Sequence, residues 1–225
     1  METKITKRNF AEWEPYELEE VFGLKSVRSL PALAEWVSAA HPIPDYWERA
    51  IETLSARLYE NRSYWNEDEL KMQFVGPLLH TVEFYGEGFS AFSDRPLSAV
   101  YNGVELFGTA DWMVAAGKGK PKSPFFFLHE YKRIKMGESD PYGQVLAAML
   151  AAQIRNADGK PVYGCAVIAQ FWHFVLLDGD EFSISEGFDA TTPHEIAKIW
   201  SILAETKKRI VVRVAELKEK ESGRA

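Results

Sequence analysis

Apolar residues in the first third of the chain recur every three to four positions and predict helices. These helices cover residues 31–40, 44–61 and 66–82. Asn66 is a good N-cap for the third of them, and Glu69 three residues later completes a capping-box pattern. Because proline lacks an N–H group, Pro77 predicts a kink or break in this helix near Gly76.

After residue 82 the hydrophobic pattern changes to the two-residue alternation of strands. The dipeptide Asn102-Gly103, between two such runs, is a strong hairpin signal. Strands are predicted at residues 97–101, 104–115, 124–134, 162–169, 172–177 and 181–185, and further helices at residues 140–154 and 194–221. This order of elements is typical of an α/β domain, so we expect a mixed central β-sheet flanked by helices.

The N-terminal segment differs from the rest of the chain. Residues 9–23 carry five glutamates and no lysine or arginine, and aromatic residues lie among them. We interpret residues 1–25 as an acidic, irregular arm packed on the body of the protein. Residues 26–225 have the length of one large domain, and we expect a single α/β domain there.

Composition narrows the class of protein. Of the 225 residues 46% are hydrophobic, which is enough for a core, and no apolar run reaches the roughly 18 residues of a membrane span. The N-terminal residues lack the apolar stretch of a secretory signal. Cys165 is the single cysteine, which excludes an intramolecular disulfide and a cysteine-based zinc cluster. We therefore expect a soluble, cytoplasmic protein with no membrane partner.

The charge of the chain is unevenly distributed. A net charge of −7 argues against a protein that coats nucleic acid nonspecifically, because affinity for phosphate comes mostly from lysine and arginine. Residues 117–135 nevertheless hold six basic residues against one acidic residue, Glu130. Since this stretch brackets the candidate site described next, it predicts either a local positive field for a phosphate backbone or a solvated hairpin loop.

Two predicted strands carry charged residues where apolar ones are expected. Asp111 lies in the strand at 104–115, and Glu130 and Lys132 follow the apolar run 125–128. Because side chains alternate along a strand, Glu130 and Lys132 point to the same face. Two carboxylates suffice for a Mg²⁺ or Mn²⁺ site open to substrate, with the carbonyl of Tyr131 as a further ligand. The metal would activate a bound water, and the Lys132 ammonium would hold that water or the phosphate.

The succession of a helix, Asp111, Glu130-x-Lys132 and a second helix resembles the PD-(D/E)XK nuclease superfamily, which has the restriction-endonuclease-like fold. The 19 positions from Asp111 to Glu130 are a normal separation for a hairpin between the two motif halves. Upstream, residues 67–79 resemble the glutamate-bearing first helix in the nuclease region of type I restriction subunits. Ala110 precedes Asp111 in place of the motif's proline, a departure common in the superfamily. The resemblance covers about residues 66–177.

The resemblance implies a metal-dependent nuclease that hydrolyses phosphodiester bonds in nucleic acid, with DNA as the expected substrate. Asp111 and Glu130 would bind the metal and Lys132 would activate water. A glutamate from the preceding helix would complete the site. Glu67 fits the family spacing to Pro77 better, whereas Glu69 already has the capping role.

A glutamine of the following helix is a further candidate. Gln144 resembles the glutamine that some of these families place near the metal, where it would position Lys132 or water. The alternative for Gln144 is a solvated residue at the start of a helix. His129 points to the opposite side of its strand from Glu130, and we interpret it as a packed residue.

Two alternatives to an active nuclease stay open. A Glu-x-Lys pair on a strand is often an exposed ion pair, although the apolar run 125–128 argues against a fully exposed strand. A nuclease fold can also lose activity and persist as a binding module. The second hypothesis is therefore a catalytically inactive interaction protein in a defence or mobile-element system, which the acidic charge favours. A homodimer agrees with the resemblance, but no heptad seam marks the last helix, so the oligomeric state stays open.

Overall fold

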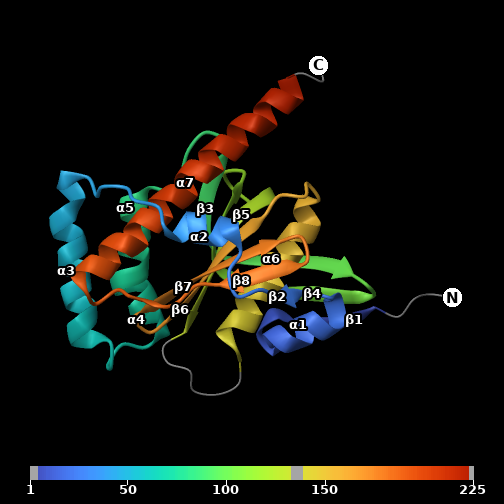
Figure 1. Ribbon diagram of the computed structural model, residues 1–225, viewed down its shortest axis with the longest axis horizontal. Helices are drawn as coiled ribbons and strands as arrows, with labels where there is room; N and C mark the ends of the chain where they lie inside the picture. The colour runs from blue at the N-terminus through green and yellow to red at the C-terminus, as the bar shows by residue number, and fades with distance from the viewer. Residues whose placement is uncertain (1–4, 133–138, 223–225) are drawn as a thin grey trace.

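The computed structural model describes residues 5–132 and 139–222, and in that part of the chain one mixed nine-stranded sheet is flanked by helices (Figure 1). The α/β class expected from the sequence is therefore confirmed. The strands are β1 (Thr6–Asn9), β2 (Lys25–Ser26), β3 (Phe89–Tyr101), β4 (Val104–Ala116), β5 (Lys122–Lys132), β6 (Val162–Ile168), β7 (Phe171–Asp178), β8 (Glu181–Ile184) and β9 (Phe188–Asp189).

Apart from the first helix, which was not predicted, the helices lie close to their predicted positions. They are α1 (Pro15–Phe22), α2 (Pro31–Val37), α3 (Asp45–Asn61), α4 (Glu67–Leu70), α5 (Gly76–Val82), α6 (Pro141–Asn156) and α7 (Pro193–Ser222), with a 3-10 turn η1 (Phe10–Glu12) and a π-helical segment η2 (Lys71–Val75). Asn66 caps α4 as predicted, because its side chain accepts from the N–H of Glu69 while the Glu69 carboxylate accepts from the N–H of Asn66.

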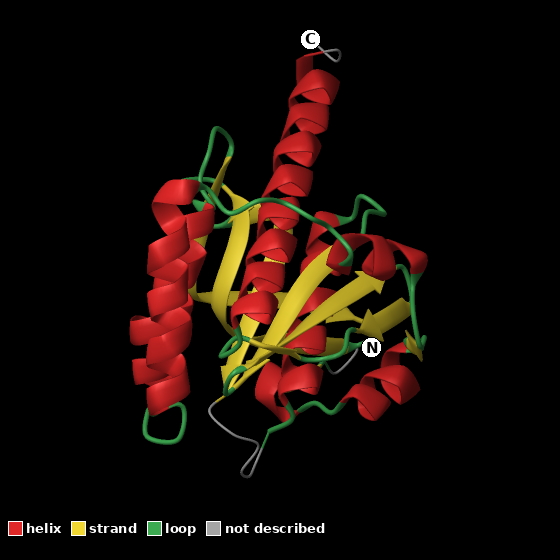
Figure 2. Ribbon diagram, turned by 60° about the vertical axis from the view of Figure 1, so that its left-hand side comes forward, coloured by secondary structure: helices red, strands yellow, loops and turns green. Residues whose placement is uncertain are grey.

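The helices cover both faces of the sheet and enclose two apolar cores (Figure 2). Helices α1 and α6 pack on one face, where the small and branched side chains of α6 meet Met113 and Leu128. Helices α2, α3, α5 and α7 pack on the other face around Phe127 and Phe174. Burial of a Leu or Phe side chain stabilises the fold by about 1.5–3 kcal/mol relative to exposure. Because both faces of the sheet are buried, this energy determines toward which face each side chain of a strand points.

The central strands set the position of the candidate site. Strand β4 pairs antiparallel with β3 on one side and with β5 on the other, and β5 pairs parallel with β6. Parallel neighbours need a long crossover, and α6 supplies it between β5 and β6. The Asn102-Gly103 turn between β3 and β4 is confirmed, since both residues have positive φ angles of 49° and 76°.

Strand β3 begins at Phe89, eight residues before the predicted start at Leu97. The polar stretch that contains Asp94 and Pro96 has the composition of a turn, which hid the strand from the sequence pattern. Within the described residues β3 pairs with β4 alone, so it is an edge strand. An edge tolerates proline because the missing N–H need not face a second strand.

The N-terminal segment contains more regular structure than its pattern predicts. Strand β1 pairs parallel with β4, and β2 pairs parallel with β8, so the segment adds strands at two places in the sheet. Phe10, Trp13 and Leu18 are buried in the core beside α6. The expectation of an irregular segment was wrong because strand pairing with distant residues does not register in a local pattern.

Pro77 does not break the helix that contains it. Segments α4, η2 and α5 run on without interruption from Glu67 to Val82, and the N–H of Gly76 donates to the carbonyl of Lys71 in the wider π pattern. The wider turn inserts one extra residue just before Pro77, where an ordinary helix would require the N–H that proline lacks. The helix is therefore not broken, and a π turn lies where the kink or break was predicted.

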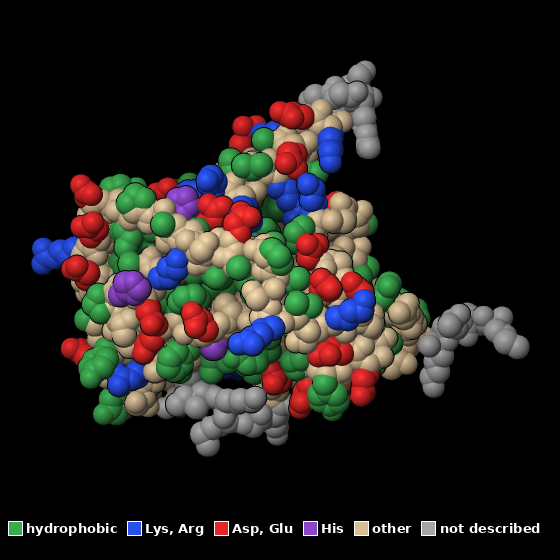
Figure 3. Space-filling model, viewed as in Figure 1, with side chains coloured by type: hydrophobic (Ala, Val, Ile, Leu, Met, Phe, Trp, Pro, Cys, Tyr) green, Lys and Arg blue, Asp and Glu red, His purple; other side chains and the backbone are tan. Residues whose placement is uncertain are grey.

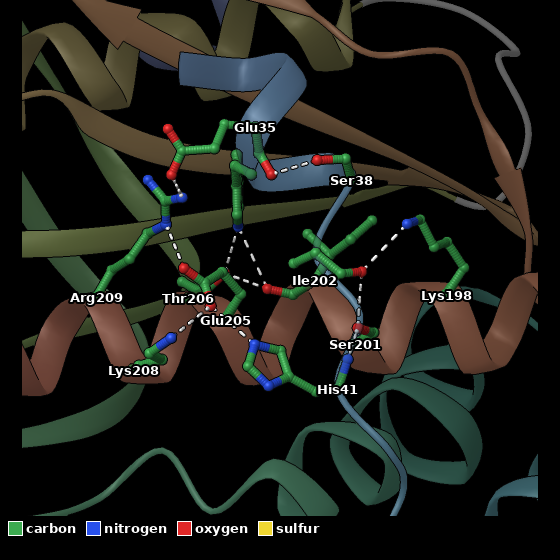
Figure 4. A network of polar contacts seen from close by, with 12 residues as sticks. Glu35, Ser38, His41, Lys198, Ser201, Ile202, Glu205, Thr206, Lys208 and Arg209 are labelled. Carbon is green, nitrogen blue, oxygen red and sulfur yellow. Dashed lines mark hydrogen bonds and ion pairs between the residues drawn. The ribbon is translucent and has the colours of Figure 1, made fainter. Parts of the chain in front are cut away.

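Helix α7 is the longest element, at about 45 Å for its 30 residues, and it crosses the face of the sheet (Figures 1 and 2). A polar network fastens α2 and the segment after it to α7 (Figure 4). The indole N–H of Trp36 donates to Thr206 at 2.9 Å, and Arg209 donates to Glu35 at 2.7 Å and to Glu205 at 3.0 Å. The Trp36 side chain is fully buried, so these bonds satisfy a polar atom that would otherwise be costly to bury.

The surface shows no broad basic area on the face drawn in Figure 3, where acidic and basic side chains alternate. Among the described residues, no helix combines the length and apolar character needed to span a membrane.

Candidate functional site

Asp111 and Glu130 lie next to each other in neighbouring strands. The antiparallel β4–β5 ladder ends at the pair Trp112–His129, and Asp111 and Glu130 are the next residues of the two strands, opposite each other if the register is continued. The N–H of Tyr131 donates to Asp111 Oδ2 at 2.9 Å, so the carboxylate of β4 is held against the backbone of β5. Directly opposed residues in antiparallel strands share a face, so the two carboxylates lie on the same side of the sheet.

Lys132 lies beside Glu130, as the two-residue spacing predicted. Its Nζ is 3.2 Å from Glu130 Oε1, and the exposed fractions of the two side chains are 27% and 4%. The pair is therefore not an exposed surface ion pair, which was the alternative to a metal site in the sequence analysis. A carboxylate this deeply buried requires compensation from a neighbouring charge, a proton or a metal ion.

Glu67 reaches the same place from the helix layer through Lys71. Lys71 Nζ is 2.8 Å from Glu67 Oε1 and 2.9 Å from Asp111 Oδ1, so one ammonium joins a helix carboxylate to a strand carboxylate. The aromatic face of Tyr131 lies 5.7 Å from the same nitrogen. Glu69 is exposed, and its carboxylate is used in the cap with Asn66. Of the two candidate glutamates, the structure brings Glu67 to Asp111.

The electrostatics of the site are dominated by burial and by the mutual repulsion of carboxylates. The pKa of Glu130 is raised to about 8: burial is the largest cause, the charge of Asp111 acts in the same direction, and Lys132 opposes both effects. Partial burial lowers the pKa of Lys71, but its hydrogen bonds to Glu67 and Asp111 outweigh this and hold that pKa above its ordinary value. Near neutral pH Glu130 therefore carries a proton, and Lys71 stays charged.

The residues of the site carry the donor atoms that a divalent metal ion prefers, but their arrangement suits such an ion only in part. The Glu67 and Asp111 oxygens already converge on a cation, the ammonium of Lys71, which stands where a metal would be attracted. Hard carboxylate oxygens are the ligands that Mg²⁺ and Mn²⁺ prefer. Within residues 5–132 and 139–222, however, no three carboxylate, histidine or cysteine side chains are arranged as a metal-binding group. A metal would require Lys71 to move and Glu130 to lose its proton.

Other predicted residues have different surroundings. Gln144 lies in the first turn of α6, with its Oε1 atom buried, and within the described residues that atom has no hydrogen-bond partner. No hydrogen bond joins it to Lys132 or Glu130 in that part of the chain, so its predicted positioning role stays a prediction. His129 is 1% exposed among the rings of Trp112, Phe127, Tyr131 and Trp172, which confirms it as a packed residue.

The basic stretch does not bracket the site as expected. Lys118 and Lys120 lie in the turn at the opposite end of the β4–β5 hairpin. Glu130 is eight positions after Lys122 along β5, which is about 26 Å in an extended strand. A hairpin joins the two strands at one end only, so charges close in sequence are distant in space. Arg133 and Lys135 lie outside the described residues.

Sequence reasoning missed two residues at the site. Lys71 stands four residues after Glu67, a spacing typical of a helical ion pair, but its contact with Asp111 depends on tertiary structure. Asp94 lies between two β3 residues that pair with the β4 residues on either side of Asp111, so it stands across from Asp111. It has a positive φ of 50°, an uncommon conformation that local patterns do not reveal.

No family model matches the sequence, and the search of curated proteins found no significant match.

Proposed function

We propose that this protein is a Mg²⁺- or Mn²⁺-dependent nuclease of the PD-(D/E)XK type that hydrolyses phosphodiester bonds in nucleic acid, with DNA as the expected substrate. One arrangement carries the proposal. Asp111 and Glu130 stand side by side on β4 and β5, Lys132 is paired with Glu130, and Glu67 arrives from the helix layer. A buried carboxyl group with a perturbed pKa, such as that of Glu130, is more frequent at functional sites than elsewhere.

Each residue has a distinct role in the proposed reaction. Asp111 and Glu130 hold the metal, and Glu67 supplies a further oxygen from the opposite side. When bound, the metal lowers the pKa of a coordinated water and offsets the negative charge that builds on the phosphate. Lys132 donates hydrogen bonds to the attacking water or to the phosphate oxygens. Gln144 orients Lys132 or the water.

The pairing of β5 with β6 also supports the proposal. Because these strands are parallel, α6 must cross one face of the sheet between them, and its first turn starts on the side where β5 ends. The carboxyl ends of parallel strands and the start of the following helix are common places for ligands in α/β proteins. Lys132 is the last residue of β5, so the proposed reaction takes place at such an end.

Cleavage of DNA and RNA by the purified protein, with Mg²⁺ or Mn²⁺ present, tests the proposal. Asp111→Asn and Lys132→Met should each lower the rate about a hundredfold or more, because each removes a group that acts on the transition state. Asp180→Asn and Lys207→Met are matched controls, since these residues form ion pairs with Lys25 and Glu83 instead. Wild-type cleavage rates in Asp111→Asn would refute the assignment.

A specific observation favours a second candidate, a catalytically inactive interaction protein of the same fold. Lys71 already neutralises Glu67 and Asp111 without a metal, and the net charge of −7 disfavours a phosphate partner. This candidate predicts that neither Mg²⁺ nor Mn²⁺ raises the midpoint of thermal unfolding. A metal-dependent increase that disappears in Asp111→Asn would count against it.

A further inference from the structure

Lys71 is the most tightly held charged side chain at the candidate site. Its Nζ lies within hydrogen-bond distance of two carboxylates from different layers of the fold, Glu67 Oε1 at 2.8 Å and Asp111 Oδ1 at 2.9 Å. The side chain is 25% exposed, and its nitrogen also lies 5.7 Å from the ring centre of Tyr131. Two anionic oxygens and the negative face of an aromatic ring are the surroundings that a cation prefers.

The helix is shaped to deliver this lysine. Lys71 is the first residue of the π segment, and the N–H of Gly76 donates to its carbonyl. A π turn adds one residue to a helical turn and so rotates everything before it relative to everything after it. The buried side chains of α5 can therefore pack in the core while Glu67 and Lys71 are directed toward the strands.

Glu130, the remaining carboxyl group of the site, has little positive charge around it. Its side chain is buried, and among the described residues only Lys132 lies within ion-pair distance of it. Without Lys71, Glu67 and Asp111 would face each other uncompensated beside this buried carboxyl group. Some cation is required in the space that the Lys71 ammonium occupies.

We propose that Lys71 is the resting counter-ion of the candidate site and that a divalent cation binds there by displacing the Lys71 ammonium from Asp111. Lys71 then sets the affinity of the site for metal, because its contacts with Glu67 and Asp111 must be broken before those oxygens turn to the incoming ion. The inference rests on the proposed function, since it assumes that the site takes a divalent metal.

Calorimetric titration of Mn²⁺ into the wild-type protein and Lys71→Met tests this inference. Removal of a charge within 3 Å of the ligand oxygens should tighten Mn²⁺ binding about tenfold or more. Lys207→Met is the matched control: it changes the net charge equally, but Lys207 pairs with Glu83, the residue after α5, so the substitution leaves the site intact. Its affinity for Mn²⁺ should equal that of the wild type.

Thermal unfolding gives a second readout that does not depend on cleavage. Without metal, Lys71→Met should unfold at a lower temperature than the wild type, because Glu67 and Asp111 then repel each other. Saturating Mn²⁺ should raise its midpoint by more than it raises the wild-type midpoint. If Lys71→Met does not fold, Lys71→Gln removes the charge and keeps a donor, and the same two comparisons apply.

The outcomes separate this inference from the proposed function. Equal or weaker Mn²⁺ binding in Lys71→Met, with clear binding to the wild type, would overturn the counter-ion role and leave the metal site standing. Tighter binding in both Lys71→Met and Lys207→Met would show a general charge effect and would also overturn it. Absence of Mn²⁺ binding in wild type and variant alike would overturn the proposed metal site, and this inference with it.

Discussion

Replacing Glu130 with glutamine should make the protein more stable at alkaline pH and leave its stability almost unchanged near pH 4. In the folded protein burial raises the pKa of Glu130 to about 8 from an ordinary value of 4.5. Between these two pH values the folded state holds a proton that the unfolded state releases. The contribution of Glu130 to the free energy of unfolding therefore falls as the pH rises from about 4.5 to about 8 and levels off above that.

The size of this effect follows from the difference between the two pKa values. Each unit is worth about 1.4 kcal/mol, so the full penalty above pH 8 is about 5 kcal/mol, and at pH 7 it is about 3 kcal/mol. The Glu130 side chain is 4% exposed, so screening by solvent reduces these figures little. Glutamine has nearly the same shape as glutamate and does not titrate. The stability of Glu130→Gln should therefore not show this decline with rising pH.

Urea unfolding of the wild type and Glu130→Gln at pH 5, 7 and 9 measures the difference. Glu17→Gln is a control of opposite sign, because the hydrogen bond from Arg8 lowers the pKa of Glu17 and so stabilises the folded state at neutral pH. Its stability should be below wild type at pH 7. A constant difference between Glu130→Gln and wild type from pH 5 to 9 would refute the reasoning, since it would mean that the buried carboxyl group does not titrate anomalously.

Three further predictions concern other parts of the chain. In Gly143→Ala the new Cβ would lie 2.0 Å from a backbone oxygen of the N-terminal segment, so its unfolding midpoint should drop by several degrees, whereas Gly119→Ala, with open space around it, should not change. Burial lowers the pKa of His129 to about 3, so the contribution of His129 to wild-type stability should fall as the pH drops below about 6.5, by about 2 kcal/mol at pH 5. Glu130 titrates in the opposite sense over this range, so the urea unfolding free energies of wild type and His129→Phe should be compared at each pH, and their difference should change by that amount. Under the proposed function, calorimetry should show Mn²⁺ binding tighten by up to about tenfold per pH unit between pH 6 and 8, because the metal must replace the proton on Glu130.

The sequence predicted the parts of the fold and site that depend on local periodicity. Strand alternation placed Glu130 and Lys132 on one face, and the cap at Asn66 located the start of a helix correctly. Neither conclusion needed knowledge of distant residues. The pairing of Asp111 with the β5 backbone agrees with the order of motifs, because a hairpin brings its two strands together whatever its loop contains.

What the sequence did not predict depends on tertiary contacts. The strand that carries Asp94 was hidden because its polar residues and Pro96 have turn composition, and only an edge position makes them acceptable in a sheet. The role of Lys71 was not predicted, because its partner Asp111 lies 40 residues away in the sequence. The basic residues after Ala116 were expected near the site for a similar reason. In a hairpin of this length, however, residues that are close in sequence can be distant in space.

The π turn before Pro77 makes the orientation of a helix depend on the number of residues it contains. Each residue turns an α-helix by about 100°, so the one extra residue acts as an angular offset between the end that is anchored in the core and the end that carries Glu67. Deletion of a single residue there would keep the length, composition and apolar spacing of α5 nearly intact. It would nevertheless turn Glu67 and Lys71 away from Asp111. In this helix an insertion or deletion of one residue is therefore a larger change than most substitutions, because it redirects every side chain upstream at once.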